Sequence, residues 1–275
     1  MKNLTGKVVV ITGAAGGIGK ALTKAFLSSG ASIWALDQNA AALKQLEREG
    51  EKYSEPIQTL RVDVSNYDDI KTALKEITEK TPAIHYWINN AGISGIGDFM
   101  EKPLEDFETT LKVNLNGVVI GTRLAIEHME KLGRGSVVNV ASVAGHISAP
   151  YLCAYSASKH AVVGFTRALR QELKLKDCPI KLLLVSPGFV DTQMIQKGTQ
   201  EGFPEWLSSV LSTPEDVAEE MLAGIIKDKE EIFPTWNGKA LLKMYRLFPA
   251  MTTRSSRILL AKSFKDLLLL RKTPP

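Results

Sequence analysis

Continuous apolar runs alternate with helical patterns along most of this chain, and that alternation strongly limits what it can fold into. A strand buried on both faces is apolar throughout, whereas a strand with one wet face alternates apolar and polar residues. The runs at 8–11 and 182–185 contain no polar residue. Strands joined through helices are predicted to run parallel, with helices on both faces of one sheet. The predicted strands are 7–12, 31–36, 57–62, 84–89, 135–140, 180–185 and 231–234, and the predicted helices are 20–29, 40–49, 67–79, 104–132, 151–176 and 214–226.

Size and composition fit one α/β domain with a sheet of about seven strands. Of the 275 residues, 44% are apolar and 23% charged, so the chain can bury a full core without disulfides or metals. Its two cysteines, Cys153 and Cys178, cannot form a disulfide framework and lack the spacing of metal ligands. No metal is expected, and a reducing, cytoplasmic setting fits best. No run approaches the roughly 18 apolar residues of a membrane span, and the first run is too short for a signal peptide.

The net charge of +4 comes from the carboxyl-terminal part of the chain. From residue 239 onward there are nine Lys and Arg against one acid, a balance of +8, so the residues before it sum to −4. The main body therefore gives no reason to expect nucleic acid. In the extension, 238–275, apolar and basic residues mix in two runs, 241–248 and 258–270. Such basic amphipathic helices can lie on an anionic membrane, fold back over a pocket or contact another subunit.

A glycine-rich turn joins the first predicted strand to the first helix. It reads TGAAGGIG from Thr12 onward, with Gly13, Gly17 and Gly19 spaced four and then two apart. Glycine lets a backbone approach a pyrophosphate closely, and the amino end of a helix favours its negative charge. The turn is not a P-loop, because Ala14 stands where that motif requires glycine. The alternative is a turn that only packs strand against helix.

Asp37 follows the second predicted strand, 18 residues after Gly19. A carboxylate at this position can accept hydrogen bonds from both adenosine ribose hydroxyls and would repel a 2′-phosphate. Gln38 beside it adds no positive charge. Asp37 could also cap the helix predicted from residue 40, and the two roles are compatible. Ser65 is likewise placed to cap the helix predicted from residue 67.

Tyr155 and Lys159 lie four residues apart near the start of a predicted helix, so they share one face. A tyrosine with a pKa near 10 is a poor base at neutral pH, and a nearby lysine ammonium would favour its phenolate. Ser142 follows the fifth predicted strand, where its hydroxyl can point into a cleft above the sheet. Asn114 interrupts an apolar stretch of a predicted helix and needs a partner or a function. Taken singly, the Tyr155 and Lys159 pair could be surface packing, Ser142 a turn residue and Asn114 a buried, hydrogen-bonded amide. Only their combination favours a catalytic site.

These pieces together resemble the short-chain dehydrogenase/reductases, in their subtype of roughly 250 residues. The resemblance runs from about residue 7 to residue 234, nearly the whole chain except the basic extension. It implies one Rossmann-type, doubly wound domain over residues 1–237, with extra helices in the extension 238–275. The matching pieces are the turn 12–19, Asp63-Val64, the run Asn89-Asn90-Ala91-Gly92, Asn114, Ser142, Tyr155 with Lys159, and Pro187-Gly188.

The resemblance implies a role for each matching residue, and no catalytic position departs from the family pattern. Tyr155 exchanges a proton with the substrate oxygen, and Ser142 hydrogen-bonds that oxygen. Lys159 lowers the pKa of Tyr155 and binds the nicotinamide ribose. Asn114 holds a water that links Lys159 to solvent. The implied cofactor contacts are Gly13, Gly17, Gly19 and the backbone of Ile18 at the pyrophosphate, Asp37 at the adenosine ribose, Asp63 and Val64 at the adenine, Asn90 and Gly92 along the adenosine side, and Pro187, Gly188, Val190 and Thr192 at the nicotinamide.

By analogy, Asp37 implies NAD rather than NADP, and the family transfers a hydride while Tyr155 moves the proton. In the family, the segment 189–213 is the substrate lid. Here it carries no Arg and is rich in apolar residues, which suits a lipophilic alcohol or ketone, although these side chains could equally pack the lid on the core. They are Phe189, Met194, Ile195, Phe203, Trp206, Leu207, Val210 and Leu211, and Ile93, Phe99, Ile147 and Tyr151 could face them.

The sequence thus favours an NAD-dependent oxidoreductase that acts on a lipophilic secondary alcohol or its ketone. An NADPH-dependent 3-oxoacyl or carbonyl reductase is the alternative enzyme, and Asp37 disfavours it. A dinucleotide-binding sensor or scaffold without turnover is the alternative of another class, and the intact set of Ser142, Tyr155 and Lys159 disfavours it.

A homodimer or homotetramer is expected, because the helices that hold Asn114 and Tyr155 form subunit contacts in similar proteins. The expected location is the cytoplasm, with peripheral membrane contact through the basic extension as one of its open roles. Two residues near the site in sequence have plain structural expectations: His146 in a solvated loop and Cys153 as a small packed side chain.

Overall fold

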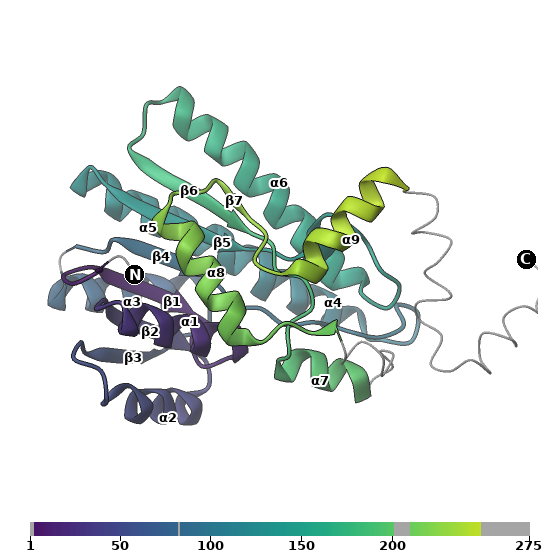
Figure 1. Cartoon of the computed structure of the whole chain (residues 1–275), viewed down its shortest axis with the longest axis horizontal. Helices are drawn as coiled ribbons and strands as arrows, with labels where there is room; N and C mark the ends of the chain where they lie inside the picture. Colours follow the sequence, from purple (N-terminus) through teal and green to yellow (C-terminus); the bar gives the residue numbers. More distant parts are fainter. Residues whose placement is uncertain (1–2, 82, 201–209, 249–275) are drawn as a thin grey trace, which may run out of the picture.

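The computed structural model describes residues 3–81, 83–200 and 210–248. Within them lies one sheet of seven parallel strands in the order β3-β2-β1-β4-β5-β6-β7 (Figure 1). The predicted α/β fold with a doubly wound parallel sheet is therefore confirmed. The strands are β1 (Val8–Thr12), β2 (Ser32–Asp37), β3 (Ile57–Arg61), β4 (Tyr86–Asn89), β5 (Gly135–Val140), β6 (Ile180–Val185) and β7 (Glu231–Ile232).

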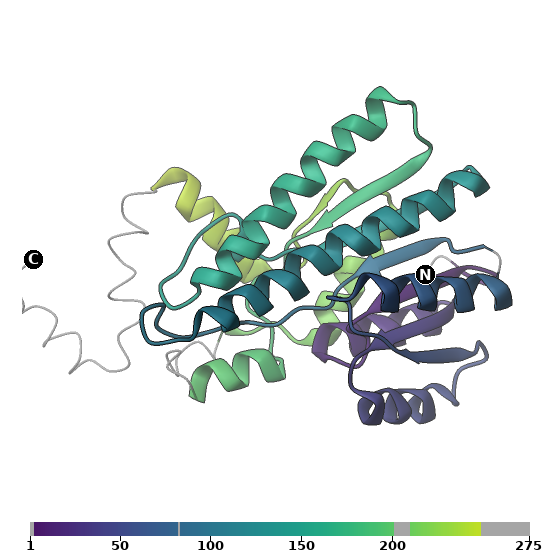
Figure 2. The ribbon, with the colours of Figure 1, turned by 180° about the vertical axis from the view of Figure 1, so that it is seen from behind.

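Helices cover both faces of the sheet, and each face has its own apolar core. On one face, α1, α2 and α8 bury Phe26, Leu43 and Met221. On the other, α3, α5 and α6 bury Ile77, Met129 and Leu173, and the view from behind places α5 and α6 in front (Figure 2). The helices are α1 (Gly17–Ser28), α2 (Ala40–Gly50), α3 (Tyr67–Lys80), α4 (Leu104–Leu111), α5 (Gly117–Leu132), α6 (Cys153–Leu175), α7 (Gln193–Gln200), α8 (Pro214–Ile226) and α9 (Trp236–Leu247).

The strand order reverses between β1 and β4, and this reversal positions the site. Strands β1 to β3 step outward to one side, whereas β4 lies on the other side of β1. The helices that follow β1 and β4 lie on opposite faces of the sheet, so a crevice opens beyond the carboxyl ends of these strands. The register aligns Ile11 with Ile88, so the loops after β1 and β4 begin side by side.

Buried polar side chains fix the strands beneath the crevice. Asn89 Nδ2 donates to Asn139 Oδ1 (2.9 Å) and Thr122 Oγ1 (3.1 Å). Trp87 Nε1 donates to Asn89 Oδ1 (2.8 Å), and Asn139 Nδ2 donates to Thr166 Oγ1 (3.0 Å). Amides that are buried and satisfied in a low dielectric favour one arrangement over others. The network therefore holds β4 and β5 in register with α5 and α6.

The helix predicted over 104–132 is not continuous. A π-helical turn, η1 (Lys112–Asn116), separates α4 from α5. Such single turns insert an extra residue into the helix and redirect side chains, often at functional sites. Here the turn carries Asn114, which is fully buried.

Helix α3 is capped by a different residue from the one predicted. Asn66 Oδ1 accepts hydrogen bonds from the amides of Asp68 (2.9 Å) and Asp69 (3.4 Å). Ser65 instead donates its hydroxyl to Asp63 Oδ1 (2.7 Å). The prediction for Ser65 was wrong by one position, because both residues are good caps and local pattern does not separate them.

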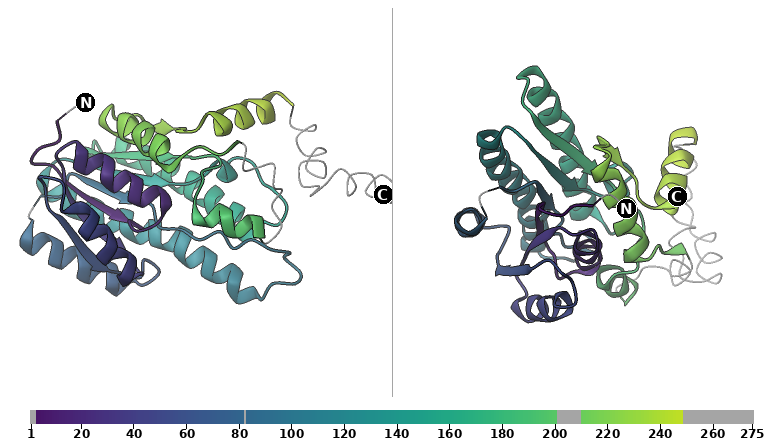
Figure 3. Two further views of the ribbon diagram at one scale, coloured as in Figure 1. Left: turned by 60° about the horizontal axis from the view of Figure 1, so that its bottom comes forward. Right: turned by 60° about the vertical axis from the view of Figure 1, so that its left-hand side comes forward.

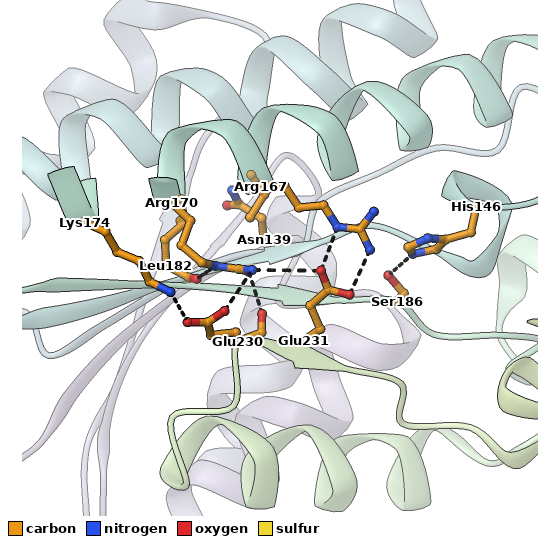
Figure 4. A network of polar contacts seen from close by, with 10 residues as sticks. Asn139, His146, Arg167, Arg170, Lys174, Leu182, Ser186, Glu230 and Glu231 are labelled. Atoms are coloured by element: carbon orange, nitrogen blue, oxygen red, sulfur yellow. Dashed lines mark hydrogen bonds and ion pairs between the residues drawn. The ribbon is translucent and has the colours of Figure 1, made fainter. Parts of the chain in front are cut away.

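A charged network holds the edge strand β7 against α6 (Figure 4). Arg167 donates two hydrogen bonds to the Glu231 carboxylate, at 2.7 and 2.9 Å. Arg170 donates from Nε to the Leu182 carbonyl (2.8 Å) and from Nη2 to the Glu230 carbonyl (2.6 Å). Bidentate pairs of this kind are strong and directional. Because β7 pairs with β6 at only two positions, the network gives this short strand a second attachment.

Helix α9 follows β7 and extends away from the sheet at the end of the molecule where α7 lies (Figure 3). It begins at Trp236, so the boundary expected between residues 237 and 238 falls inside its first turn. Among the described helices, α9 included, none has both the length and the apolar character needed to cross a bilayer.

Candidate active site

The glycine-rich turn between β1 and α1 depends on close backbone approaches. Gly13 has φ +63°, in the left-handed region that favours glycine, and a Cβ there would lie 2.7 Å from Ala91 Cα. A Cβ at Gly19 would overlap the carbonyl oxygen of Gly13. Asn90 Nδ2 donates to the carbonyls of Thr12 and Gly13, at 3.1 Å each. The turn after β1 is therefore pinned to the loop that leaves β4.

The amino end of α1 opens into this turn. The helix begins at Gly17, three residues before its predicted start, and its N-cap, Gly16, makes no side-chain capping hydrogen bond. The amides of the first turn carry partial positive charge, and the helix dipole adds to it. Glycines have no side chain that would keep a phosphate away from these amides. A glycine-rich turn at the amino end of a helix is therefore an arrangement that binds phosphate.

Asp37 lies at the end of β2, at the rim of the same cleft. Its Oδ2 accepts a hydrogen bond from the Ala15 amide (3.1 Å), and its Oδ1 accepts one from the Asn39 amide (3.0 Å). The cap of α2 is Asn39, whose Oδ1 accepts from the Ala42 amide (3.1 Å), so Asp37 does not take that alternative role. Each carboxylate oxygen keeps acceptor capacity for a hydroxyl. Asp37 can thus order the phosphate turn and still bind a ribose.

Two residues that follow β3 line the cleft beside Asp37. Asp63 Oδ1 accepts hydrogen bonds from the amide (2.9 Å) and the hydroxyl (2.7 Å) of Ser65, which fixes its carboxylate. Val64 is buried. An apolar surface with one fixed polar group beside it suits the face and edge of a base.

Tyr155 and Lys159 share one face of α6, with Lys159 Nζ 5.7 Å from the centre of the Tyr155 ring. Lys159 is buried and donates to the Val140 carbonyl (2.9 Å), and burial lowers its pKa to about 8. Burial raises the pKa of Tyr155, and a hydrogen bond with Ser142 acts in the opposite direction. Burial is the larger of these two effects, and the lowering of the Tyr155 pKa by Lys159 that the sequence suggested stays a prediction. A neutral phenol at this position is suited to donate a proton.

Ser142 follows β5 and caps a short 3-10 turn, η2 (Val143–Gly145). Its Oγ accepts a hydrogen bond from the Ala144 amide (3.1 Å) and donates to the Pro187 carbonyl (3.4 Å). These contacts hold the hydroxyl between β5 and the loop after β6, next to Tyr155. A substrate oxygen placed between the two hydroxyls could accept a hydrogen bond from each.

Asn114 lies behind the cleft rather than in its wall. Its Oδ1 accepts a hydrogen bond from the Ile93 amide (2.8 Å), and its Nδ2 donates to the Ile93 carbonyl (2.8 Å) and to Ser158 Oγ (3.1 Å). Ser158 Oγ donates in turn to the Tyr155 carbonyl (2.7 Å). The side chain therefore ties the loop after β4 to the first turn of α6. The expected role of Asn114 in holding a water stays a prediction.

The loop after β6 is held by two residues that the sequence analysis did not single out. Thr235 Oγ1 accepts a hydrogen bond from the Gly188 amide (2.8 Å). Asn237 Oδ1 accepts one from the Phe189 amide (3.1 Å), and its Nδ2 donates to the carbonyls of Phe189 and Val210, both at 2.9 Å. Because Phe189 begins the segment predicted to be a lid and Val210 lies near its end, Asn237 ties these two parts of the chain together.

One cleft of about 460 Å³ brings the predicted site together. Its size is that of a small-molecule or cofactor site. The glycine-rich turn in its wall leaves so little room that one added Cβ would collide with neighbouring atoms. The residues therefore fit a dinucleotide. The cleft is lined by Gly13, Gly17, Ile18, Gly19, Asp37, Asp63, Val64, Asn90, Gly92, Ser142, Tyr155, Lys159, Pro187, Gly188, Val190 and Thr192.

A smaller pocket of about 240 Å³ adjoins the cleft at Gly95, which lines both. Its wall is largely apolar and comes from the loop after β4 and from α4, with Phe99, Met100, Leu104 and Phe107. Of the residues expected to face the lid, Phe99 lines this pocket, Ile93 lines the main cleft with Met194 and Ile195, and Ile147 and Tyr151 line neither. Phe203, Trp206 and Leu207 lie outside the described residues.

Two neighbours of the site differ from their expectations. His146 is half-buried and shares a 3.0 Å hydrogen bond with Ser186 Oγ (Figure 4). It also packs against Phe233, with the ring centres 5.5 Å apart. It lines neither the cleft nor the adjoining pocket. Cys153 is exposed rather than packed, and it lines the smaller pocket. Both depend on how the loop before α6 folds, which local sequence does not determine.

The chain belongs to the short chain dehydrogenase family, whose model matches residues 7–202. It is 35% identical over 223 residues to the 3-oxoacyl-[acyl-carrier-protein] reductase FabG of Thermotoga maritima, covering 80% of this chain and 90% of that protein. It is 37% identical over 193 residues to 3beta-hydroxysteroid dehydrogenase 2 of Eggerthella lenta, covering 70% and 74%. The family resemblance found in the sequence is confirmed.

Solved structures of short-chain dehydrogenases are similar to most of this chain. A short chain dehydrogenase/reductase from Burkholderia phymatum in complex with NAD has a TM-score of 0.81 at 27% identity, covering 92% of this chain and 97% of that one. Other similar structures hold NADH, in a reductase from Brucella melitensis, or NADP, in ElxO. The family therefore supplies an oxidoreductase class but no single nucleotide.

We expect Asn237→Ala to weaken NADH binding about tenfold, because the loop after β6, which lines the cleft, loses its attachment to α9. Each buried backbone group left without its partner costs about 1–3 kcal/mol, so Tm should fall as well. Titration with NADH, followed by nicotinamide fluorescence, measures the first effect. Trp236→Ala, at the exposed neighbouring position, is the matched control and should change neither quantity. Unaltered NADH affinity in Asn237→Ala would show that the loop holds its position without this side chain.

Proposed function

We propose that the protein is an NAD-dependent oxidoreductase that interconverts a lipophilic secondary alcohol and its ketone. The observation that carries the proposal is one cleft in which a nucleotide cradle edged by Asp37 meets Ser142, Tyr155 and Lys159. An apolar pocket adjoins this cleft at Gly95. The fold and the family support the reaction class. Asp37 at the rim of the cleft supports NAD as the cofactor, and the apolar pocket supports a lipophilic substrate.

In this proposal the residues divide the work of a hydride transfer. A bound nicotinamide supplies or accepts the hydride at the substrate carbon. Tyr155 donates its phenolic proton to the carbonyl oxygen in reduction and receives the hydroxyl proton in oxidation. Ser142 donates a hydrogen bond to the same oxygen. Lys159, anchored on Val140, lies beside the phenol and can stabilise the phenolate that reduction leaves behind.

The proposed substrate class rests on the wall of the smaller pocket. Phe99 and Phe107 meet edge-on there, with ring centres 6.1 Å apart, and Met100 and Leu104 lie beside them. Charged groups are few in this wall, namely Lys102 and Asp106, which lie 4.0 Å apart. A pocket of this kind favours hydrocarbon over a sugar or a carboxylate.

A chain-length series of secondary alcohols with NAD⁺ tests the proposal. Each added methylene that enters the apolar pocket should raise kcat/KM about fourfold, from about 0.8 kcal/mol of transfer free energy, until the pocket is full. In the variant Phe99→Ser, which removes part of the apolar wall, the increase of kcat/KM with each methylene should disappear. The kcat/KM of the shortest alcohol should stay the same. A preference for charged or short substrates would overturn the substrate class without touching the reaction class.

An NADPH-dependent 3-oxoacyl reductase is the second candidate, and one observation favours it besides the FabG relative. Arg61 stands opposite Asp37 in the β2–β3 register, and its Nε donates to the Gln38 carbonyl (3.4 Å). A guanidinium near the ribose rim could pair with a 2′-phosphate. Asp37 lines the cleft whereas Arg61 does not, and we therefore prefer NAD.

A further inference from the structure

Helix α9 carries an exposed apolar stripe. Trp236, Met244 and Leu247 are 63%, 37% and 61% exposed, and Ala240 between them is also exposed. These positions are spaced four, four and three apart, so they line up on one face of a helix. Single exposed apolar residues are ordinary on a protein surface, but an aligned row ending in a tryptophan is the pattern of a contact surface.

Basic side chains flank the stripe on one side. Lys239, Lys243 and Arg246 repeat at intervals of four and three, and all are exposed. Within the part of the chain that the structure describes, none of them joins an ion pair, and α9 contains no acid. The sequence after α9 adds six more Lys and Arg against one acid. The exposed side of α9 is therefore both apolar and uniformly positive.

The opposite side of α9 is firmly attached to the body. Leu242 is buried, and Thr235 and Asn237 at the amino end bind the loop after β6. The helix thus presents its exposed stripe from a fixed base. Figures 1 and 2 and the left-hand view of Figure 3 place α9 at the same end of the molecule as α7.

We propose that α9 docks the protein on an anionic phospholipid bilayer, with the stripe in the headgroup region and Lys239, Lys243 and Arg246 on the lipid phosphates. Such a bilayer binds helices that carry a tryptophan at the interface, apolar side chains below it and cations beside it. A second copy of this face is disfavoured as the occupant, because a two-fold contact would bring the same positive charges together. Each cation near an anionic surface strengthens binding by about fivefold.

The docking has a consequence for the site, and this part rests on the proposed function. Asn237, one residue from Trp236, donates hydrogen bonds to the carbonyls of Phe189 and Val210. A docked α9 would therefore hold Phe189, and with it the cleft-lining Gly188 and Val190, close to the bilayer, from which a lipophilic substrate could enter. The docking itself needs no turnover, so its test can succeed or fail independently of the activity.

Co-sedimentation of the full chain with vesicles tests the proposal. We expect binding to phosphatidylcholine vesicles that contain about one-third phosphatidylserine, weaker binding at high salt, and little binding to phosphatidylcholine alone. The combined variant Lys239→Gln, Lys243→Gln, Arg246→Gln should bind about a hundredfold more weakly. The variant Met244→Ser, Leu247→Ser should also lose at least about tenfold. Turnover of a water-soluble ketone should stay unchanged in both variants.

The matched control removes the same charge elsewhere. Lys44, Lys131 and Lys227 are exposed and lie on or next to α2, α5 and α8, and their triple change to Gln should leave vesicle binding within about twofold. Wild-type protein that stays in solution, or equal losses in both triple variants, would overturn the proposal. So would a change of oligomeric state in Met244→Ser, Leu247→Ser, because the stripe would then contact a second copy.

Discussion

Replacing Tyr155 with Phe should lower kcat for alcohol oxidation by about 10³-fold or more, while the affinity for NADH stays within about threefold of wild type. The change removes only the phenolic oxygen, which moves the proton, and keeps the ring that packs in the cleft. Steady-state kinetics and an NADH titration of the same preparation separate the two effects. Retention of more than a tenth of wild-type turnover would show that another group moves the proton.

The pH dependence of the wild-type enzyme gives a second test of the role of Tyr155. Oxidation needs the phenolate of Tyr155, and burial raises the pKa of that phenol above its usual value. The oxidation rate should therefore rise with pH across the alkaline range. Reduction needs the neutral phenol, so it should already run at neutral pH. An oxidation rate that is flat from neutral to alkaline pH would contradict this assignment.

Gly19→Ala should abolish measurable cofactor binding, with a loss of at least about 100-fold in NADH affinity. The new Cβ would overlap the Gly13 carbonyl and lie 2.8 Å from Asn90 Nδ2. Neither neighbour can withdraw easily, because Asn90 itself pins that carbonyl (3.1 Å). The turn must therefore open, at a cost of about 1–3 kcal/mol or more in stability. NADH titration and thermal unfolding measure the two losses.

Gly164→Ala is the matched control, since nothing lies within 4 Å of the Cβ it would add to α6. Alanine in an exposed helical position is favoured over glycine by about 0.5–1 kcal/mol, so this variant should be slightly more stable and bind NADH normally. If Gly19→Ala bound NADH as well as Gly164→Ala does, the close approach at Gly19 would not be needed for the cofactor.

Most of the fold could be predicted because its signals are local. Both β5 and β6 have the predicted bounds, since each contains adjacent apolar residues, Val137-Val138 and 182–185, that are buried in the parallel sheet. Helix α8 also matches, with Thr213 as its cap and a proline at its first position. The parallel, doubly wound sheet followed from the alternation together with the family resemblance, whereas the order of its strands comes from the structure.

The features that the sequence missed depend on contacts between distant parts of the chain. The π-helical turn at Asn114 lies in a stretch whose apolar spacing fits one continuous helix, and the amide partner at Ile93 is 21 residues away. Asn237 reaches Phe189 across 48 residues, from a position that carries no periodic signal. The burial that raises the pKa of Tyr155 likewise depends on distant segments, and helical spacing from Lys159 does not reveal it.

In the candidate site, too, some features follow from local sequence and others depend on contacts between distant parts of the chain. The residues expected to meet a dinucleotide line one cleft because they follow the carboxyl ends of parallel strands, which the alternation already implies. The substrate side is different, because its walls come from loops and from α4. There, Phe99 lines the smaller pocket as a predicted lid-facing residue, while Ile147 and Tyr151 do not contribute.

Titration of the purified protein with NADH and, separately, with NADPH tests the central claim most directly. The claim is that the carboxylate of Asp37 reads an unphosphorylated ribose in a site built for hydride transfer. It predicts that NADH binds at least about tenfold tighter than NADPH, and that Asp37→Asn narrows the gap. Tighter binding of NADPH by the wild-type protein would contradict the claim and make the NADPH-dependent reductase the leading assignment.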